Sequence, residues 1–432
     1  MSDKILESDE WQNATDYSIT DEDIQRAEFL LNVDVASRDR QANQTATEDN
    51  IHMFAVGTGN DNPLFCDPEY AETTRWGSVV APGMMIGVLN SPMMGDPIDP
   101  EIKAKTKSLF RGVHVFVSGS TWTWHRAVKP GDTIYSFGGD ECQQVKHSEF
   151  SGRSVIRVRR DVKVNQNGDV VAVYRSLRVL SERKTAREKG KYSELKPAQY
   201  TPDDIARIDA IYEAEQVRGP EKRYWEDVSV GDTLGTMAKG PLTVTDVVMF
   251  HTGGYGYVPY KPSVGRLAWK NRNRIPAFYV NNEHGVPDVA QRLHWDPLWA
   301  QAIGNPMAYD YGVMRENYLY HYLTDWCGDD AVVVDQHDEV RKFNYMGDTQ
   351  VITGEVVGTR QENGMSLVDV VMRMTNQRGE ETVRATATIS LPSKSGGPAR
   401  YHEVPADLQR RASEMMERHW ELTAIRKKNK AK

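Results

Sequence analysis

The sequence predicts an α+β protein that contains two copies of one domain. This prediction depends on an internal repeat and on strand-like runs that follow helical segments in both halves. In the repeat, residues 64–85 align without gaps with residues 293–314 at a constant offset of 229, and six of the 22 positions are identical. Self-similarity over a segment of this length indicates a duplicated domain.

Two shorter matches keep the same order along the chain. The GDT of residues 131–133 recurs at 347–349, and the NQNGD of residues 165–169 recurs as NQRGE at 376–380. The offsets of these matches are 216 and 211 residues, so they fall gradually from the 229 of the first match. A gradual fall is expected when two copies of one domain differ in loop length.

Each copy is expected to begin with a polar loop and a short helix, at residues 67–76 in the first copy and 296–303 in the second. A more apolar helix should follow from about Pro82 and from about Asp310. Alternating runs then predict antiparallel strands, with NQNGD and NQRGE as hairpin turns. The clearest of these runs cover residues 155–164, 170–180, 351–358, 367–374 and 383–391.

Charge and helix signals set the expected domain limits. Residues 181–200 carry many charges and few apolar side chains, which is typical of a linker. Thr201 as N-cap, Pro202 at the first helical position and Asp204 at N3 then predict a connecting helix. The expected parts are an N-terminal domain at 20–182, a linker with its helix at 183–222, a C-terminal domain at 223–393 with an insertion at 255–287, and a tail at 394–432.

The composition limits the classes of function. A net charge of -8 disfavours nucleic-acid binding, which needs Lys and Arg to neutralise phosphates. The three cysteines fit no metal or redox spacing, and no GxGxxG follows a strand, so neither a metal nor a redox cofactor is expected. The acidic N-terminus resembles no secretory signal, and no segment approaches the roughly 20 apolar residues of a membrane helix. We therefore expect a cytoplasmic protein without a membrane span.

The segment GNDNPLFCDPEYAETTRWGSVVAPGMM, residues 59–85, resembles the hydratase signature of MaoC-like enzymes, in which GDxNPLHxDxxxA is followed by a helix and PIxHGM. The resemblance extends from about residue 20 to residue 392. It is to the (R)-specific enoyl-CoA hydratases and acyl dehydratases with a MaoC-type dehydratase N-terminal domain. It implies a double hot dog fold, with a long helix wrapped by an antiparallel sheet in each domain. It also implies that one copy catalyses while the other houses the acyl chain.

The first copy departs from the signature at both positions that transfer protons in the family. Asn60 stands at the signature aspartate and Phe65 at the signature histidine. Neither side chain can transfer a proton at neutral pH. Asp61 is adjacent, but it is shifted by one position and has no histidine partner. The N-terminal domain is therefore expected to accommodate the acyl chain and not to catalyse.

The second copy keeps the signature histidine. His294 aligns with Phe65, and Gly312 lies 18 residues beyond it, as Gly83 lies 18 residues beyond Phe65. In the family the histidine acts with an aspartate on water and on the carbon next to the thioester, and the glycine N–H binds the enolate oxygen. His294 and Gly312 are expected in these roles. Asp288, one residue further out than the family spacing, is expected as the partner, with a turn or helix-capping aspartate as the alternative.

A further set of residues is expected to bind substrate. Tyr309, Asp310 and Tyr311 replace family residues ahead of Gly312, and they either reshape the acyl pocket or pack against the helix. Asn282 and Arg292, which lie before and after the proposed acid Asp288, are added to them. The expected substrate-binding residues are therefore Asn282, Arg292, Tyr309, Asp310 and Tyr311.

The insertion at 255–287 is rich in aromatic and basic residues, and a loop of that length within a compact domain is expected to be functional. Its cations either meet the phosphates of coenzyme A or form a solvated face. They are Arg266, Lys270, Arg272 and Arg274.

The resemblance implies reversible hydration of a 2-enoyl-CoA to a 3-hydroxyacyl-CoA, with coenzyme A as part of the substrate and no other cofactor. The acyl group is left open among fatty, aromatic and steroid-type chains. Two alternatives remain: a thioesterase on the same fold, for which Asp310 would be the carboxylate, and an acyl-CoA-binding partner subunit without activity of its own. Both a monomer and a homodimer are compatible with a duplication that already pairs two hot dog domains.

Overall fold

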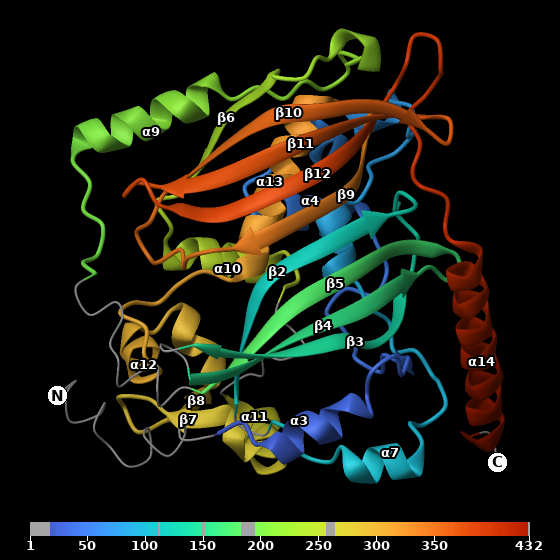
Figure 1. The fold of residues 1–432 in the computed structure, drawn as a ribbon, viewed down its shortest axis with the longest axis vertical. Helices are drawn as coiled ribbons and strands as arrows, with labels where there is room; N and C mark the ends of the chain where they lie inside the picture. The colour runs from blue at the N-terminus through green and yellow to red at the C-terminus, as the bar shows by residue number, and fades with distance from the viewer. Residues whose placement is uncertain (1–17, 111–112, 149–151, 183–194, 256–263, 431–432) are drawn as a thin grey trace.

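The computed structural model describes residues 18–110, 113–148, 152–182, 195–255 and 264–430. Within them lies a large antiparallel sheet with the strand order β1-β3-β4-β5-β2-β9-β12-β11-β10-β6 (Figure 1). The strands of the first copy are β1 (Val35–Ala36), β2 (His114–Trp124), β3 (Tyr135–Ser148), β4 (Gly152–Val164) and β5 (Val170–Ser181). Those of the second copy are β6 (Thr233–Lys239), β9 (Val332–Val340), β10 (Gln350–Glu362), β11 (Met365–Asn376) and β12 (Glu381–Leu391).

The strand order is the same in both copies when each is followed from its outer edge inward. The first copy runs β1-β3-β4-β5-β2 and the second runs β6-β10-β11-β12-β9. The two halves join where β2 pairs with β9, with Gly119 opposite Glu339 and Thr123 opposite Asp335. The predicted fold class, an α+β double hot dog, is confirmed.

The central helices of the two copies differ. In the second copy α13 (Gly312–Cys327) runs behind the sheet for 16 residues and is almost entirely buried (Figure 1). In the first copy the equivalent segment is a 3-10 helix of six residues, η1 (Gly83–Val88). The expectation of a long helix in each copy is therefore wrong for the first.

Tryptophan rings explain the short segment in the first copy. Trp122 and Trp124 stack with a ring-centroid distance of 5.7 Å on the inner face of β2. The indole N–H of Trp124 donates to the carbonyl of Gly83 at 3.1 Å, and the ring of Trp122 lies against Gly87. These rings occupy space that a longer helix would need, and glycine also weakens helix propagation.

The remaining elements surround this core. The helix α4 (Glu48–Gly57) packs against its repeat counterpart α10 (Val244–Thr252), and each begins with a capping box. The expected connecting helix is α9 (Pro202–Ala214), capped by Thr201. Shorter elements of the first copy are α3 (Asp21–Glu28), α5 (Pro63–Cys66), α6 (Pro68–Glu72) and α7 (Pro100–Lys105), and η2 (Trp225–Asp227) precedes β6.

The insertion and the tail are more ordered than their sequences indicate. The insertion contains α11 (Gly265–Arg274), η3 (Pro276–Phe278) and β7 (Tyr279–Asn281), which pairs with β8 (Pro287–Val289); residues 256–263 lie outside the described residues. The tail contains α14 (Ala406–Lys430), which runs along the first copy in Figure 1. Its Ala412 and Met416 are fully buried in a cluster with Phe137 and Val173.

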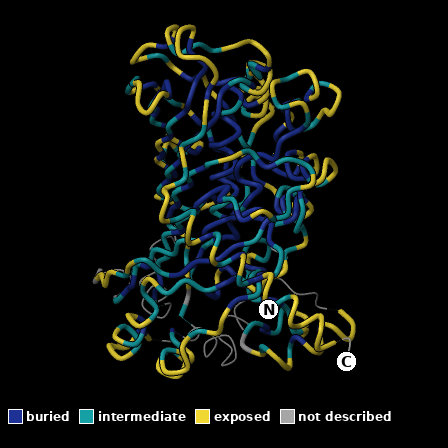
Figure 2. The backbone as a smooth tube through the Cα atoms, turned by 90° about the vertical axis from the view of Figure 1, so that its right-hand side faces the viewer, coloured by how far each residue is buried: buried dark blue, intermediate teal, exposed yellow. Residues whose placement is uncertain are grey.

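Buried backbone runs through the middle of the molecule, and exposed backbone is concentrated at its ends and edges (Figure 2). One hydrophobic cluster includes residues of both copies, such as Met85 and Trp124 with Leu319 and Val333. Among the helices in the described part of the chain, none has both the length and the apolar character that crossing a bilayer requires.

Candidate active site

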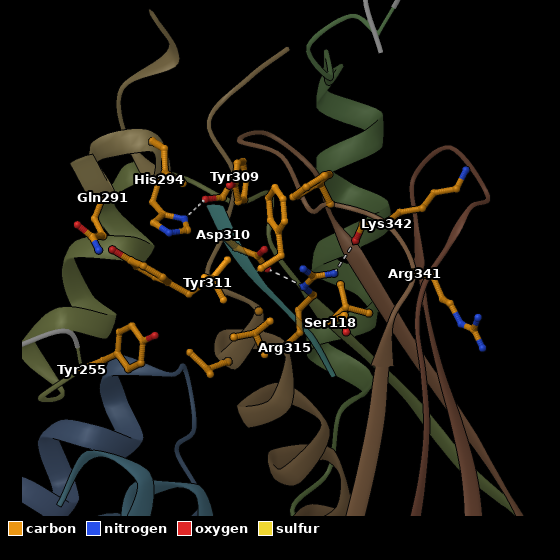
Figure 3. A pocket seen from close by; sticks show the side chains of 18 of the residues that line it. Ser118, Tyr255, Gln291, His294, Tyr309, Asp310, Tyr311, Arg315, Arg341 and Lys342 are labelled. Carbon is orange, nitrogen blue, oxygen red and sulfur yellow. Dashed lines mark hydrogen bonds and ion pairs between the residues drawn. The ribbon is translucent and has the colours of Figure 1, made fainter. Parts of the chain in front are cut away.

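A cavity of about 460 Å³ lies at the N-terminal end of α13. Its walls come from β2 of the first copy, Tyr255, η4 (Ala290–His294), the segment 309–311 with α13, and the end of β9 with the segment after it (Figure 3). The residues that line it are Val115, Phe116, Val117, Ser118, Tyr255, Ala290, Gln291, Leu293, His294, Tyr309, Asp310, Tyr311, Gly312, Val313, Arg315, Val340, Arg341, Lys342 and Phe343.

Gly312 is the first residue of α13 and lies at the cavity. The N-cap residue, Tyr311, makes no side-chain capping hydrogen bond. The first N–H groups of a helix have no intrahelical partner and carry partial positive charge. A Cβ added at Gly312 would meet no atom closer than the carbonyl oxygen of Val117, at 3.8 Å. The space beside this helix end can therefore admit a ligand oxygen.

His294 is held at the cavity wall in one tautomer. Its Nδ1 lies 2.8 Å from the carbonyl oxygen of Tyr309. Since a carbonyl only accepts, Nδ1 carries the proton and Nε2 keeps the lone pair. Burial, with a smaller contribution from His251, lowers the pKa of His294 to about 3, although backbone hydrogen bonds at Tyr309 and Asp310 oppose the shift. The imidazole is therefore neutral at pH 7, and Nε2 can accept a proton.

The two tyrosines of the sequence prediction enclose His294. The ring of Tyr311 lies 3.7 Å from the imidazole, centroid to centroid, and its hydroxyl lies 3.0 Å from Nε2 of His251. Tyr309 meets His294 edge-on at 5.1 Å and packs on Phe343 at 4.6 Å. Both tyrosines line the cavity and also pack against neighbouring rings. That they shape a pocket for an acyl group stays a prediction.

Asp310 also lines the cavity, and it is 1% exposed. Its Oδ2 lies 3.0 Å from Nε of Arg315 and accepts from the side-chain amide of Asn344 at 2.9 Å. Among the described residues, its buried Oδ1 has no hydrogen-bond partner. Burial raises the pKa of Asp310 to about 6, although Arg315 and Asn344 oppose the shift. A proton can therefore be carried by this carboxyl near neutral pH.

The sequence did not single out Arg315 or Asn344, which hold Asp310. Arg315 is 2% exposed, and its Nη1 donates to the carbonyl of Lys342 at 2.8 Å. One signal was present, because Arg315 lies in the first turn of the helix expected to be wrapped by the sheet, and a buried arginine needs a partner. Asn344 follows β9 and reaches Asp310 only through the tertiary fold, so no local pattern could indicate it.

Three residues of the sequence prediction lie outside the cavity lining, namely Asp288, Asn282 and Arg292. Asp288 is in β8, partly exposed, and its Oδ1 accepts from the N–H of Val289 at 2.7 Å. Asn282 closes a turn after β7, where its side chain accepts from the N–H groups of His284 and Val286. The exposed cations of α11, which include Arg266 and Lys270, do not line the cavity either.

Arg292 holds the segment that carries His294. It is 1% exposed, pairs with Asp296 at 2.8 Å, and stacks on the ring of Trp299. Its Nη1 donates to the carbonyl of Val280 at 2.9 Å. Arg292 does not line the cavity, so its contacts in this structure join β7 and η4 to α12 (Pro297–Ala302).

The equivalent site in the first copy is filled. Phe65 is buried, and only about 40 Å³ remains beside it, between Trp76 and Tyr320. A Cβ at Gly83 would lie 2.8 Å from the ring of Trp124. The side chain of Asn60 accepts from the N–H of Asn62 and so stabilises the loop. The first copy is expected to house the acyl chain, but the space beside Phe65 is too small for one. The copy instead supplies one wall of the second copy's cavity, through β2.

Comparisons with known proteins agree with this architecture. Residues 37–174 match the family model described as FAS1-like, dehydratase domain region. Among solved structures, a MaoC-like dehydratase is 14% identical, covers 84% of this chain and 99% of its own, and superposes with a TM-score of 0.56. No curated protein sequence matches the chain significantly.

Two other solved structures are more distant. A MaoC-like dehydratase from Phytophthora capsici is 12% identical, with 86% of this chain and 99% of its own covered and a TM-score of 0.48. A conserved Mycobacterium tuberculosis protein described as having a double hot dog fold is 12% identical, with 84% and 96% covered and a TM-score of 0.46.

The resemblance predicted from the sequence is confirmed: the chain is similar to the MaoC-like dehydratases, through a family-model match in its first copy and a double hot dog fold over most of its length.

Proposed function

We propose that the chain catalyses the reversible hydration of a 2-enoyl-CoA to a 3-hydroxyacyl-CoA. One observation carries the proposal: a neutral histidine and an open helix N-terminus lie in the same cavity, at His294 and Gly312. Hydration of an enoyl thioester needs a base for water and donors for the enolate oxygen, and these two groups have that chemistry.

In the proposed reaction, Nε2 of His294 accepts a proton from water while the water oxygen bonds to C3. The electron pair of the C2–C3 double bond moves toward the thioester carbonyl, whose oxygen gains negative charge. The N–H of Gly312 donates to that oxygen, and the partial positive charge of the α13 N-terminus stabilises it. A second group must then protonate C2. The sequence predicts Asp288 for this role, but Asp288 lies outside the cavity lining, so the structure leaves the acid unassigned.

Two cations at the cavity support an anionic substrate such as a coenzyme A thioester. Arg341 and Lys342 are exposed, and they form ion pairs with Glu339 and Glu380 respectively. Exposed ion pairs contribute little to stability, so a phosphate group can replace a carboxylate at small cost. We expect higher salt concentration to raise KM for the thioester.

A thioesterase is the second candidate, because the Asp310 carboxyl lines the same cavity beside the helix start. A carboxylate there could activate water against the thioester carbonyl instead of C3. The two reactions give different products, since hydrolysis releases free coenzyme A and hydration consumes the enoyl chromophore.

The test is an assay of short, long, branched and aromatic enoyl-CoA thioesters with wild type, His294→Ala and His419→Ala. His419 on α14 is a matched control, because it is a buried histidine that lies outside the cavity lining and accepts from the N–H of Met94. We expect the wild type and His419→Ala to remove the enoyl absorbance and His294→Ala not to. Release of free coenzyme A would favour the thioesterase, and binding without reaction would favour a partner subunit.

A further inference from the structure

Hydration requires two proton transfers, and the mechanism above gives a cavity residue to only one of them. His294 takes the proton of water, but Asp288 lies outside the cavity lining and is partly exposed. Asp310 is the carboxyl group that, within the described residues, lines the cavity. Asp310 is therefore the candidate for the acid that protonates C2.

The hydrogen bonds of Asp310 determine which of its oxygens can carry a proton. Oδ2 forms an ion pair with Nε of Arg315 at 3.0 Å and accepts a hydrogen bond from the amide of Asn344 at 2.9 Å. Oδ1 is buried and has no hydrogen-bond partner among the residues described. Because Oδ2 holds the ion pair and the hydrogen bond, which both favour negative charge there, the proton of the neutral carboxyl belongs on Oδ1.

A polar chain behind Asp310 fixes its orientation. Asn344 accepts from the side chain of Gln350 at 2.8 Å, and Gln350 in turn accepts from the hydroxyl of Thr382. All three residues are buried. A side chain held in this way does not need to reorganise during the reaction, which is the usual advantage of a positioned acid.

Asp310 is also linked through the backbone to the group that fixes His294. The carbonyl that accepts from Nδ1 of His294 belongs to Tyr309, the residue directly before Asp310. Figure 3 shows both side chains at the same cavity, with the ring of Tyr311 beside them. Two residues after Asp310, the chain reaches Gly312, so base, acid and enolate donor are grouped within one short segment and η4.

We propose that Asp310 is the acid partner of His294 and that its Oδ1–H protonates C2; the assignment rests on the proposed hydratase function. In the forward reaction, one water O–H bond and the C2–C3 π bond break, and a C3–O and a C2–H bond form. His294 ends with an added proton, and Asp310 ends as the carboxylate. Transfer of one proton from His294 to Asp310 through solvent restores the pair, so no net proton is consumed.

This assignment gives a specific pH dependence. For hydration the pair must carry one proton, on Asp310, and for dehydration it must also carry one, on His294. The overall reaction neither takes up nor releases a proton. The pH profile of kcat/KM should therefore be the same in both directions. The pKa of Asp310 is about 6, raised by burial and by Asp348 and lowered by Arg315 and Asn344. With His294 neutral above pH 3, kcat/KM should fall in both directions as pH rises through about 6.

The experiment measures pH profiles of kcat/KM for wild type, Asp310→Asn, Asp288→Asn and Asn344→Ala, with a melting curve for each. Asp288→Asn is the matched control, since it makes the same chemical change outside the cavity lining. We expect Asp310→Asn to lower kcat/KM by roughly 10² or more and to abolish the fall near pH 6. Asp288→Asn should keep the fall and most of the activity.

Asn344→Ala keeps the inference testable if Asp310→Asn does not fold. This change removes a donor to the charged carboxylate, so the fall in kcat/KM should move to higher pH. A merely structural role for Asp310 would change the amplitude of the profile but not its position.

The outcomes separate the two claims. A wild type that hydrates no enoyl-CoA overturns the proposed function and, with it, this assignment. A hydrating wild type whose Asp310→Asn variant keeps both its activity and the fall near pH 6 overturns the assignment of Asp310 alone. The assignment is also overturned if Asp288→Asn removes the activity and the fall near pH 6. It is overturned as well if the fall in kcat/KM of Asn344→Ala occurs at the same pH as in the wild type.

Discussion

At the scale of single residues, two aligned glycines occupy opposite environments. Gly312 has free space at the position of a Cβ, whereas a Cβ at Gly83 would lie 2.8 Å from Trp124 and 2.9 Å from Tyr320. The repeat therefore preserves the same residue for different reasons. In the second copy the glycine leaves a helix end open to a ligand, and in the first copy it permits close packing.

This difference predicts opposite effects of the same substitution. Gly312→Ala should leave the melting temperature near that of the wild type but lower kcat/KM by roughly 10-fold to 10²-fold, because a methyl group displaces the substrate from the helix end. Gly83→Ala should lower the free energy of unfolding by about 1–3 kcal/mol through overpacking, while the folded fraction stays active. Thermal melts and kinetics on both variants check the prediction, and equal loss of activity in both would contradict it.

Some of the site could be predicted residue by residue, and some could not. The equal 18-residue spans placed His294 and Gly312, and the structure brings both to one cavity with Tyr309, Asp310 and Tyr311. The prediction of Asp288 followed family spacing across an insertion, and the structure places this residue outside the cavity lining. Spacing is a weak guide across an insertion, because the added residues can change which side chain faces the site.

At the scale of elements, a pair of buried acids lies where α13 crosses the junction of β2 and β9. Glu316 follows Gly312 by one helical turn, and Asp338 is on β9. The hydroxyl of Ser120 on β2 donates to Asp338 at 2.6 Å, and the indole N–H of Trp122 donates to Glu316 at 3.3 Å. Burial and the adjacent Asp338 raise the pKa of Glu316 to about 8, and burial raises that of Asp338 to about 6.

These shifts predict how stability depends on pH. A carboxyl whose pKa is higher in the folded than in the unfolded state stabilises the fold when protonated. This contribution is lost as pH rises from the unfolded value near 4.5 through about 8 for Glu316. In the wild type, the free energy of unfolding should fall between pH 5 and pH 8. In Glu316→Gln it should fall by less, with a difference on the order of a few kcal/mol.

Urea unfolding at pH 5 and at pH 8 measures this difference. Glu355→Gln is a suitable control, because it makes the same chemical change on β10 at a residue that is not among the buried residues. An identical pH dependence in the wild type and Glu316→Gln would show that Glu316 keeps its ordinary pKa in the folded protein.

The elements also show where the sequence was sufficient. The alternating runs and the NQNGD and NQRGE turns placed β4, β5, β10, β11 and β12, because strands with one buried face carry a period of two. The short η1 was not predicted, since the obstacle is the Trp122–Trp124 stack on β2, about 40 residues further along the chain. The helix α14 was not predicted either, because its buried side chains are few, among them Ala412, Met416 and His419.

At the scale of the whole molecule, the two copies divide one task. The first copy supplies β2 as a wall, the second supplies the groups proposed to react, and the β2–β9 junction fixes one relative to the other. The space available to an acyl group is about 460 Å³ in the cavity, against about 40 Å³ at the filled site of the first copy. Cavities of a few hundred Å³ suit small ligands.

The cavity size predicts a preference among substrates. Short acyl chains should give the highest kcat/KM, and steroid-type chains should react at least roughly 10-fold more slowly, because the cavity has about 460 Å³ and the equivalent position of the first copy is filled. Competition kinetics with enoyl-CoA thioesters of increasing length check this. A preference for the longest or ring-bearing chains would mean that the first copy opens when substrate binds.

The most direct test of the central claim, that the second copy alone catalyses, is the hydration rate of His294→Ala beside that of Asn60→Ala. His294 stands at the signature histidine of the second copy, and Asn60 stands at the signature aspartate of the first. Each variant loses one polar side chain. We expect His294→Ala to lose roughly 10² or more of the wild-type kcat and Asn60→Ala to retain it at temperatures where both are folded. Equal losses in the two variants, or a larger loss in Asn60→Ala, would contradict the division of roles between the copies.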